Sequence, residues 1–287
     1  MKLQKDISLA GYTTFKIGGK SEYFVSAENK KDIVDAVRFA KEKNLPLFIL
    51  GAGSNVLALD EGYKGMVIKI DNDKYEVSGT RIKAEAGAMI RDLVNAAAEA
   101  SLTGLEWAAG IPGTIGGAVF GNAKAFEGKT EDSIEEVEVF DIETEKTKKI
   151  TREECGFSEK QSIFKRKKSL IILSVVLRLE EGDKDKIGKL VKEHINTRKQ
   201  KHPLDFGSAG SVFVNKPGRE PSSYLIEKAG LKGRKVGGAQ VSEKHSGFIV
   251  NLGTASSKDV LELIKTVKKE VKNKLGVDLE EEVQIIK

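Results

Sequence analysis

Gly51-Ala52-Gly53-Ser54-Asn55 is followed further along the chain by a second glycine-rich segment, Gly-Ile-Pro-Gly-Thr-Ile-Gly-Gly-Ala, at residues 110–118. Glycine has no Cβ, so it tolerates positive φ and lets another group come close to the backbone. Two such segments beside apolar runs predict backbone N–H groups arranged around an anionic ligand. A cofactor that carries phosphate is therefore the first hypothesis.

The first glycine segment does not complete a known nucleotide fingerprint. Val56 stands where G-x-G-x-x-G needs its third glycine, and no Gly-Lys-Ser/Thr ending of a P-loop follows. A Rossmann nicotinamide site is therefore not expected. Ser54 and Asn55 add side-chain donors to the backbone N–H groups, which suits a pyrophosphate. Taken alone, this segment fits a tight structural turn as well as it fits ligand binding.

The composition is that of a globular chain. It has 287 residues, of which 39% are hydrophobic and 32% charged, enough for a core divided among two or three compact units. The formal charge of +5 is a small excess, and the lysines are interleaved with glutamates without an aromatic stacking motif. We therefore expect no nucleic-acid partner. The one basic block, at residues 165–168, is interpreted as a solvated turn beside a strand.

Cysteine, histidine and hydropathy patterns narrow the class further. Cys155 is the only cysteine, which excludes an intramolecular disulfide and a thiolate zinc site. No pair of the three histidines has metal-ligand spacing, so no metal is expected. Residues 1–9 contain no apolar signal core, and no stretch approaches the roughly 20 apolar residues of a membrane span. The prediction is a cytoplasmic protein without membrane contact.

Apolar periodicity predicts both helices and strands. The expected helices are at residues 29–43, 89–101, 184–199, 221–229 and 258–275. Strands are expected at 47–50, 65–70, 169–179 and 277–286, within 74–86 with a turn at Ser78-Gly79, and as two strands within 133–150 joined near residues 141–144. The last helix should be capped by Ser256 or Ser257 and end at Gly276. The predicted fold class is α+β with mixed sheets, and a domain boundary is expected near residue 201.

Several further motifs accompany the glycine segments, and together they resemble the UDP-N-acetylenolpyruvoylglucosamine reductase family. The resemblance is carried by Tyr12-Thr13-Thr14-Phe15-Lys16-Ile17-Gly18-Gly19, residues 51–57, residues 110–118, Asn122-Ala123, Cys155-Gly156-Phe157, Gly210-Ser211-Val212-Phe213, residues 237–242 with His245, and residues 279–286. The order of these motifs agrees with the family over nearly the whole chain. Length and spacing are similar to the shorter of its two classes.

The resemblance implies an FAD-binding domain of two lobes, with a vanillyl-alcohol-oxidase-like flavin fold, and a smaller α+β substrate domain. The expected divisions are residues 1–64 for lobe 1, 65–198 for lobe 2 and 199–287 for the substrate domain, whose terminal strand could pack back on the flavin lobes. The cofactor-binding residues that it implies are Gly51, Ala52, Gly53, Ser54, Asn55, Val56, Gly87, Ile111, Pro112, Gly113, Thr114, Gly116, Gly117, Ala118 and Asn122.

The resemblance also implies a reaction. In this family NADPH reduces FAD, and the flavin then reduces UDP-N-acetylglucosamine enolpyruvate to UDP-N-acetylmuramate in peptidoglycan precursor synthesis. Hydride goes to C3 of the enolpyruvyl group and a serine hydroxyl protonates C2, while the protein orients the groups and stabilises charge. The partners are these two small molecules, and the chain is expected to be a monomer. The alternatives are a related FAD-dependent oxidase and a catalytically impaired flavin-binding protein.

The resemblance places the proton donor on Ser211 and the family's glutamate on Glu282. From the residues alone, a serine in a glycine-rich loop fits a turn, although the apolar stretch that follows could hold its hydroxyl towards a flavin. Strand alternation makes Glu282 a solvated residue and turns Glu281 towards the apolar face. Glu281 is therefore the rival candidate.

The family's arginine, in a Tyr-Arg-x-Ser motif, corresponds to Lys160 within Glu159-Lys160-Gln161-Ser162. Lysine keeps the charge but loses the planar fork of arginine. The hypothesis is that Lys160 acts as a point charge that stabilises the enolic oxygen. The alternative is an exposed lysine beside Glu159, with Arg166 or another cation serving the site.

The remaining implied residues are substrate contacts and departures from the family pattern. Asn215, Gln240 and His245 lie in segments similar to those that line the family's substrate site, although His245 fits a structural histidine at least as well. Lys124 and residues 126–127 replace the family's common glycine and aromatic-glycine steps after Asn122-Ala123.

Overall fold

The computed structural model describes residues 1–287, which divide into two compact units. Unit 1 comprises residues 1–2, 25–52 and 68–198, and unit 2 comprises residues 3–24, 53–67 and 199–287. The first glycine segment is thus divided after Ala52. Helices and strands occur in both units, so the predicted α+β class is confirmed. None of the helices has the length and apolar character needed to cross a membrane.

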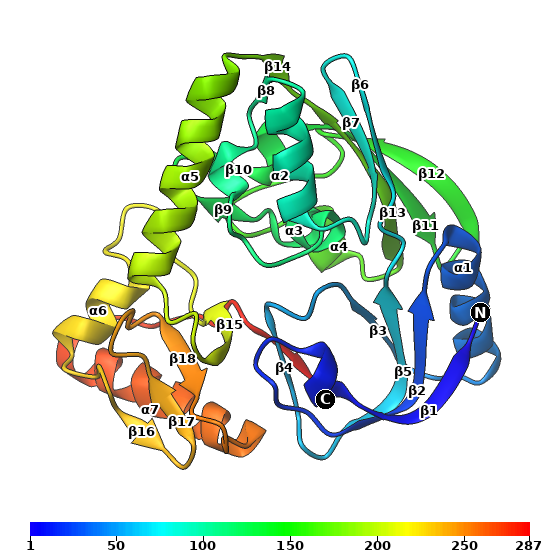
Figure 1. The fold of residues 1–287 in the computed structure, drawn as a ribbon. Coiled ribbons are helices and arrows are strands. Elements are labelled where there is room, and N and C mark those ends of the chain that lie inside the picture. The colour runs from blue at the N-terminus through cyan, green and yellow to red at the C-terminus, as the bar shows by residue number, and fades with distance from the viewer. The chain divides into compact units, whose positions relative to one another are not determined.

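Unit 1 contains a five-stranded antiparallel sheet of order β12-β11-β13-β7-β6. Its strands are β6 (Tyr75–Ser78), β7 (Arg81–Glu85), β11 (Ile134–Asp141), β12 (Lys146–Thr151) and β13 (Leu170–Arg178). The central β13 is buried on both faces over most of its length, which explains its uninterrupted apolar sequence. Helices α2 (Ile90–Glu99) and α3 (Ile115–Gly121) pack against strands of this sheet (Figure 1).

Further helices and strands lie between residues 30 and 201 of the chain. Helix α1 (Lys30–Glu42) begins where the Asn29 side chain accepts the Asp32 N–H at 3.0 Å, as an N-cap should. The remaining elements are β3 (Leu47–Leu50), β8 (Leu102–Thr103), β9 (Lys124–Ala125), β10 (Gly128–Lys129), β14 (Glu180–Glu181), α4 (Ile163–Arg166), α5 (Lys184–Lys201), and the 3₁₀ helices η2 (Glu106–Ala108) and η3 (Thr130–Asp132).

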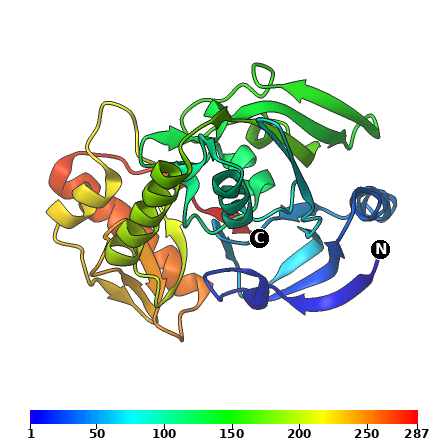
Figure 2. The same cartoon turned by 45° about the horizontal axis from the view of Figure 1, so that its top comes forward.

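Unit 2 contains a four-stranded antiparallel sheet of order β15-β18-β17-β16. Its strands are β15 (Gly207–Ser211), β16 (Lys235–Val236), β17 (Ala239–Val241) and β18 (Phe248–Asn251). Helix α7 (Ser257–Leu275) packs on β16 and β17, and α6 (Ser222–Lys228) packs on α7 (Figure 2). The buried side of α7 is one stripe at helical spacing, namely Val260, Leu263, Ile264, Val267 and Val271.

Two further strand groups complete the topology. β1 (Leu3–Ser8), β2 (Lys20–Ala27), β5 (Tyr63–Ile70) and β3 form a sheet of order β1-β2-β5-β3, and the 3₁₀ helix η1 (Leu9–Tyr12) follows β1. β4 (Val56–Ala58), immediately after the first glycine segment, pairs in parallel with β19 (Gln284–Ile286).

The predicted elements are mostly present, and α7 begins and ends where expected. Ser256 is its N-cap, with Asp259 completing a capping box, and Gly276 follows its last turn with φ +70°. The basic block at residues 165–168 contains the end of α4 and the turn before β13. The second glycine segment was expected to be a loop, but α3 begins within it at Ile115, because Thr114 caps the helix and Ile115, Ala118 and Val119 are buried.

The strand expected at residues 277–286 is the clearest error. Only Gln284–Ile286 is a strand, Ile285 is 37% exposed, and Ile286 is buried instead. The N–H groups of Glu282 and Val283 both donate to the carbonyl of Val212, at 2.8 and 3.4 Å. Two residues therefore oppose one, as in a bulge, and the inward and outward alternation shifts by one position.

Candidate functional site

Within unit 1, the end of β3 lies against the start of α3, so the two glycine segments meet. A Cβ on Gly51 would lie 2.7 Å from the Thr114 hydroxyl oxygen. That oxygen accepts the N–H of Gly117 at 3.2 Å and caps α3. Only a glycine at position 51 permits this approach, so the first segment is matched to the second by packing.

Close backbone packing explains two of the other glycines in or near α3 but not the third. A Cβ on Gly116 would lie 2.9 Å from the Ala86 carbonyl oxygen, and one on Gly87 would lie 2.7 Å from the Asn72 carbonyl oxygen. Both positions are therefore required by close backbone packing. Gly117, by contrast, is exposed, and a Cβ there would meet only the Thr114 hydroxyl at an ordinary 3.5 Å. Protein packing does not explain the glycine at position 117.

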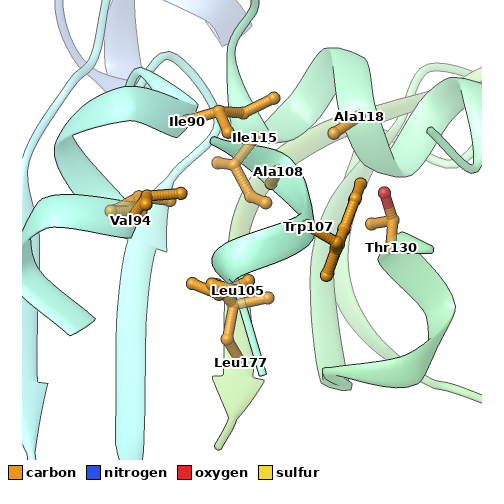
Figure 3. Close-up of a pocket in the computed structure, with 10 residues that line it drawn as sticks. Ile90, Val94, Leu105, Trp107, Ala108, Ile115, Ala118, Thr130 and Leu177 are labelled. Atoms are coloured by element: carbon orange, nitrogen blue, oxygen red, sulfur yellow. The ribbon is translucent and has the colours of Figure 1, made fainter. Parts of the chain in front are cut away.

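Unit 1 also contains a small apolar pocket (Figure 3). It is lined by α2, α3, the segment around η2, η3 and β13, through Ile90, Leu93, Val94, Leu105, Trp107, Ala108, Ile115, Ala118, Thr130 and Leu177. Thr130 supplies the only hydroxyl among these residues, and the indole N–H of Trp107 is bonded to the Gly104 carbonyl at 3.2 Å. Such a lining offers no charge or N–H array to a phosphate, so the pocket belongs to the core and not to the anion site.

Within unit 2, the second half of the first glycine segment is anchored to the segment at residues 12–14. Gly53 has φ +68°, and a Cβ there would lie 2.0 Å from the Tyr12 carbonyl oxygen. The Gly53 carbonyl accepts the Thr14 N–H at 3.1 Å, and the Thr14 hydroxyl donates to the Ser208 carbonyl at 2.6 Å. A Cβ on Gly210 would lie 4.0 Å from the Ser54 carbonyl oxygen, which is ordinary van der Waals contact. The glycine segment therefore borders the β15 segment that ends in Ser211.

The same segment is also bonded to the chain around residue 282. The Asn55 carbonyl accepts the Gln284 N–H at 3.0 Å, and the Asn55 amide donates to the Glu282 carbonyl at 3.3 Å. One of the two amide hydrogens of Asn55 is thus used within the protein. The parallel pairing of β4 with β19 continues this contact.

Ser211 and Glu282 belong to adjoining segments of unit 2. The Glu282 N–H donates to the carbonyl of Val212, the residue after Ser211, at 2.8 Å. Val212 is buried, whereas Ser211 and Glu282 are half-buried. The rival Glu281 is exposed, and its carboxylate pairs with the Lys268 ammonium of α7 at 2.7 Å. Glu281 thus forms an ion pair with α7, whereas Glu282 adjoins the Ser211 segment, and the choice of Glu282 as the family's glutamate stays a prediction.

Lys160 belongs to unit 1, where it occupies a tight turn. Ser158 and Gln161 exchange two backbone hydrogen bonds of 3.1 Å, and Lys160 between them has φ +55°. The Lys165 ammonium donates to the Lys160 carbonyl at 2.7 Å. The alternative cation, Arg166, is exposed and donates to the Gly156 carbonyl of its own loop at 3.2 Å.

The three predicted substrate residues all have partners inside unit 2. The Asn215 side-chain oxygen accepts the N–H and the hydroxyl of Ser222 at 2.8 and 2.9 Å, at the start of α6. The Gln240 amide donates to the Gly233 carbonyl at 3.2 Å. His245 lies in an aromatic cluster with His202 and Phe248, at centroid distances of 5.4 and 4.9 Å. Burial lowers the pKa of His245 and so favours its neutral imidazole.

Comparison with known proteins decides the family. The model described as "UDP-N-acetylenolpyruvoylglucosamine reductase, C-terminal domain" matches residues 202–286, and that described as "FAD binding domain" matches residues 21–151. The UDP-N-acetylenolpyruvoylglucosamine reductase of Clostridium botulinum (strain Alaska E43 / Type E3) is 42% identical over 286 residues, which are 99% of this chain and 93% of that protein. This chain belongs to the UDP-N-acetylenolpyruvoylglucosamine reductase family.

Further members of the UDP-N-acetylenolpyruvoylglucosamine reductase family agree in sequence and structure. The relative from Caldanaerobacter subterraneus subsp. tengcongensis is 41% identical, over 99% of this chain and 94% of its own length. The crystal structure of the enzyme from Thermus caldophilus matches with a TM-score of 0.85 and 36% identity, covering 100% of both chains. The family resemblance predicted from the motifs is confirmed.

Sequence reasoning missed the residues that support the second glycine segment in this member of the reductase family. The Arg198 guanidinium of α5 donates to the Ala109 carbonyl at 2.9 Å, and a Cβ on Gly110 would lie 2.8 Å from the Arg198 side chain. His194, one turn earlier, bonds to the Glu106 carbonyl at 2.7 Å and stacks on Phe126. The i, i+4 spacing of His194 and Arg198 on one helix face was the only available signal.

Proposed function

We propose that this chain is an FAD-dependent reductase that uses NADPH to convert UDP-N-acetylglucosamine enolpyruvate into UDP-N-acetylmuramate, a step in peptidoglycan precursor synthesis. Membership of the reductase family and the match to an FAD-binding domain support this activity. One structural observation carries the proposal. The first glycine segment lies beside Gly210 and is hydrogen-bonded at Asn55 to Glu282, so a predicted cofactor segment is joined to two of the three segments that carry predicted catalytic residues, those of Ser211 and Glu282.

The residues around α3 fit a flavin nucleotide. Gly117 presents open backbone without a packing reason for glycine, and Thr114 and Gly51 form a tightly packed support beneath it. The N–H groups of residues 115–118 are bonded within the protein, that of Gly117 to the Thr114 hydroxyl, so Gly117 offers a ligand room to approach the backbone closely and not a free donor. We propose that residues 51–55 and 111–118 hold FAD, which supplies the hydride of the reaction when bound.

Ser211 is proposed to give a proton to C2 of the enolpyruvyl group, since it lies at the end of a strand whose next residue is fixed in the core. Glu282 is proposed to hold or pass on a proton at its carboxyl group beside that segment. Lys160 is proposed to stabilise the negative charge that develops on the enolic oxygen. Asn215, Gln240 and His245 are proposed substrate contacts. The division into 1–64, 65–198 and 199–287, the monomeric state and the cytoplasmic location remain predictions.

The activity can be tested spectroscopically under anaerobic conditions. The purified protein should be yellow, NADPH should bleach it, and the enolpyruvyl nucleotide should restore the oxidised spectrum. If oxygen restores the spectrum and the nucleotide does not, the protein is an oxidase. A colourless protein that cannot be reconstituted with FAD contradicts both activities.

The role of Lys160 can be tested in the same assay with Lys160→Arg. Arginine can make a second charge-assisted hydrogen bond, so nucleotide-driven reoxidation should become roughly tenfold faster. Lys168→Arg, in the exposed basic block, is the matched control and should leave the rate unchanged. An unchanged or slower rate for Lys160→Arg would argue against Lys160 as the stabilising cation.

A further inference from the structure

Asn122 follows the last residue of α3 and has an unusual environment for an asparagine. Its side chain is buried, and its backbone is left-handed with φ +43°. The amide nitrogen donates to the Glu131 carboxylate at 2.7 Å and to the Ser158 carbonyl at 2.9 Å, while the side-chain oxygen accepts the Glu131 N–H at 3.2 Å. Both amide hydrogens are therefore used, and neither remains for a ligand.

The acceptor on Glu131 stays ionised. Burial alone would raise the pKa of its carboxyl group, but hydrogen bonds from Lys129 and Asn122 outweigh burial and hold the pKa below the usual value. A hydrogen bond to an ionised acceptor is stronger than one between neutral groups. Asn122 is thus fixed firmly at one end, and its other hydrogen bond reaches the turn that carries Lys160.

A second hydrogen bond ties the same turn to α3. Ser162 is fully buried, and its hydroxyl donates to the Phe120 carbonyl at 2.7 Å. Phe120 lies in the last turn of α3, where carbonyl groups lack partners within the helix. The segment at residues 158–162 is therefore attached to the end of α3 at both its first and its last residue.

These two attachments determine where the backbone of Lys160 lies. A left-handed conformation costs a residue with a Cβ about 1–2 kcal/mol, so the turn depends on its surroundings to persist. Beside it, the Lys124 ammonium of β9 pairs with the Glu159 carboxylate at 3.2 Å. Lys124 and Glu159 both depart from the family pattern, and here they pair with each other. The Lys124 ammonium thus offsets the negative charge of Glu159 next to Lys160.

We infer that Asn122 is a positioning residue for Lys160, because it joins α3, which begins in the second glycine segment, to the turn at residues 158–161 that carries Lys160. The inference rests on the proposed function, because Lys160 matters only if an enolic oxygen needs its charge. Asn122 acts through the turn and not as a contact of FAD or substrate. Loss of its side chain should therefore slow flavin reoxidation by the nucleotide while leaving flavin reduction by NADPH unchanged.

The test uses Asn122→Gly, which keeps a residue suited to positive φ and removes only the side-chain bonds. Asn44→Gly is the matched control, since Asn44 follows α1, has φ +53° and is exposed. In stopped-flow experiments on the FAD-loaded protein, Asn122→Gly should slow reoxidation roughly tenfold or more. Its reduction by NADPH, and both steps in Asn44→Gly, should stay within about twofold of the wild type.

A double-mutant cycle with Lys160→Ala separates positioning from general damage. If Asn122 acts through Lys160, adding Asn122→Gly to Lys160→Ala should change reoxidation by less than about twofold. Hydrogen exchange should also become faster in residues 156–164 of Asn122→Gly and stay unchanged there in Asn44→Gly. Should Asn122→Gly fail to retain FAD, Ser162→Ala removes the other attachment and is assessed in the same way.

The outcomes distinguish the two proposals. Three results would overturn the positioning role alone. They are a double mutant whose rate loss is the product of the two single-mutant losses, equal slowing of flavin reduction and reoxidation in Asn122→Gly, and unchanged hydrogen exchange in residues 156–164. A wild-type flavin that the nucleotide does not reoxidise would refute the proposed function, and the positioning role with it.

Discussion

Replacing Gly117 by alanine should stabilise the protein and weaken its hold on FAD. Gly117 lies inside α3, where alanine is favoured over glycine by about 1 kcal/mol at an interior position and by less near an end. The new methyl group would meet only the Thr114 hydroxyl, at 3.5 Å. We therefore expect the free energy of unfolding of the FAD-free protein to rise by about 0.5–1 kcal/mol.

The effect on FAD should have the opposite sign. If the flavin nucleotide approaches the open backbone at Gly117, a methyl group there occupies space that the ligand needs. A loss of about 1.4 kcal/mol corresponds to a tenfold increase in Kd. Because FAD stabilises only the state that binds it, the advantage of Gly117→Ala over the wild type should shrink or reverse when FAD is saturating.

Urea unfolding with and without FAD, together with flavin fluorescence titration, measures both quantities. Gly188→Ala is the matched control, because Gly188 lies in α5 and a Cβ there would have nothing within 4 Å. It should stabilise the protein similarly and leave the Kd for FAD unchanged. An undiminished affinity in Gly117→Ala would refute the assignment of this backbone to FAD, and a destabilised FAD-free protein would refute the packing argument.

Three further predictions follow from other sites. Gly79→Ala should lower the free energy of unfolding by about 1–2 kcal/mol, because Gly79 has positive φ. Gly53→Ala should lower it several times more, because Gly53 also has positive φ and a Cβ there would clash with backbone. Equal urea midpoints for the two variants would contradict this. Burial raises the pKa of the Cys155 thiol to about 12, so only about one thiol in ten thousand is ionised at pH 8, and alkylation detected by mass spectrometry should begin only on unfolding. The pKa of Asp259 is lowered chiefly by the Ser256 backbone N–H, so its contribution to stability is present above the unfolded pKa of about 3.9 and lost as pH falls through the lower folded value. Asp259→Asn should therefore destabilise most at neutral pH, and a gap in urea midpoint that stays constant down to about pH 3 would argue against this origin.

Helices with complete local signals could be predicted from the sequence. In α7 the cap, the apolar stripe and the final glycine all agree, and the structure has the helix where these signals place it. The cofactor could also be predicted, because Val56 removed the Rossmann alternative and the companion motifs indicated FAD. Such agreement between local signals is what makes a segment predictable.

Elements that depend on partners distant in the sequence could not be predicted in the same way. β15 has the sequence Gly-Ser-Ala-Gly-Ser, which has little intrinsic tendency to form a strand, and it exists because it pairs with β18. Ile285 is exposed because the N–H groups of Glu282 and Val283 both donate to the Val212 carbonyl, which shifts the inward and outward alternation by one residue. The motif predicted Asn122 as a cofactor contact, whereas its partners Glu131 and Ser158, which take both amide hydrogens, emerge only from the folded chain.

The bond between Asn55 and Glu282 joins residues that are 227 positions apart. A ribosome adds roughly 5–20 residues each second. It therefore needs at least about ten seconds after making the first glycine segment before it has made Glu282 and the strand β19 that pairs with β4. During that interval residues 51–58 lack both their hydrogen-bond partners near residue 282 and the parallel strand β19. FAD capture should accordingly be a late, post-synthetic event, and nascent chains halted before residue 280 should emerge without bound flavin.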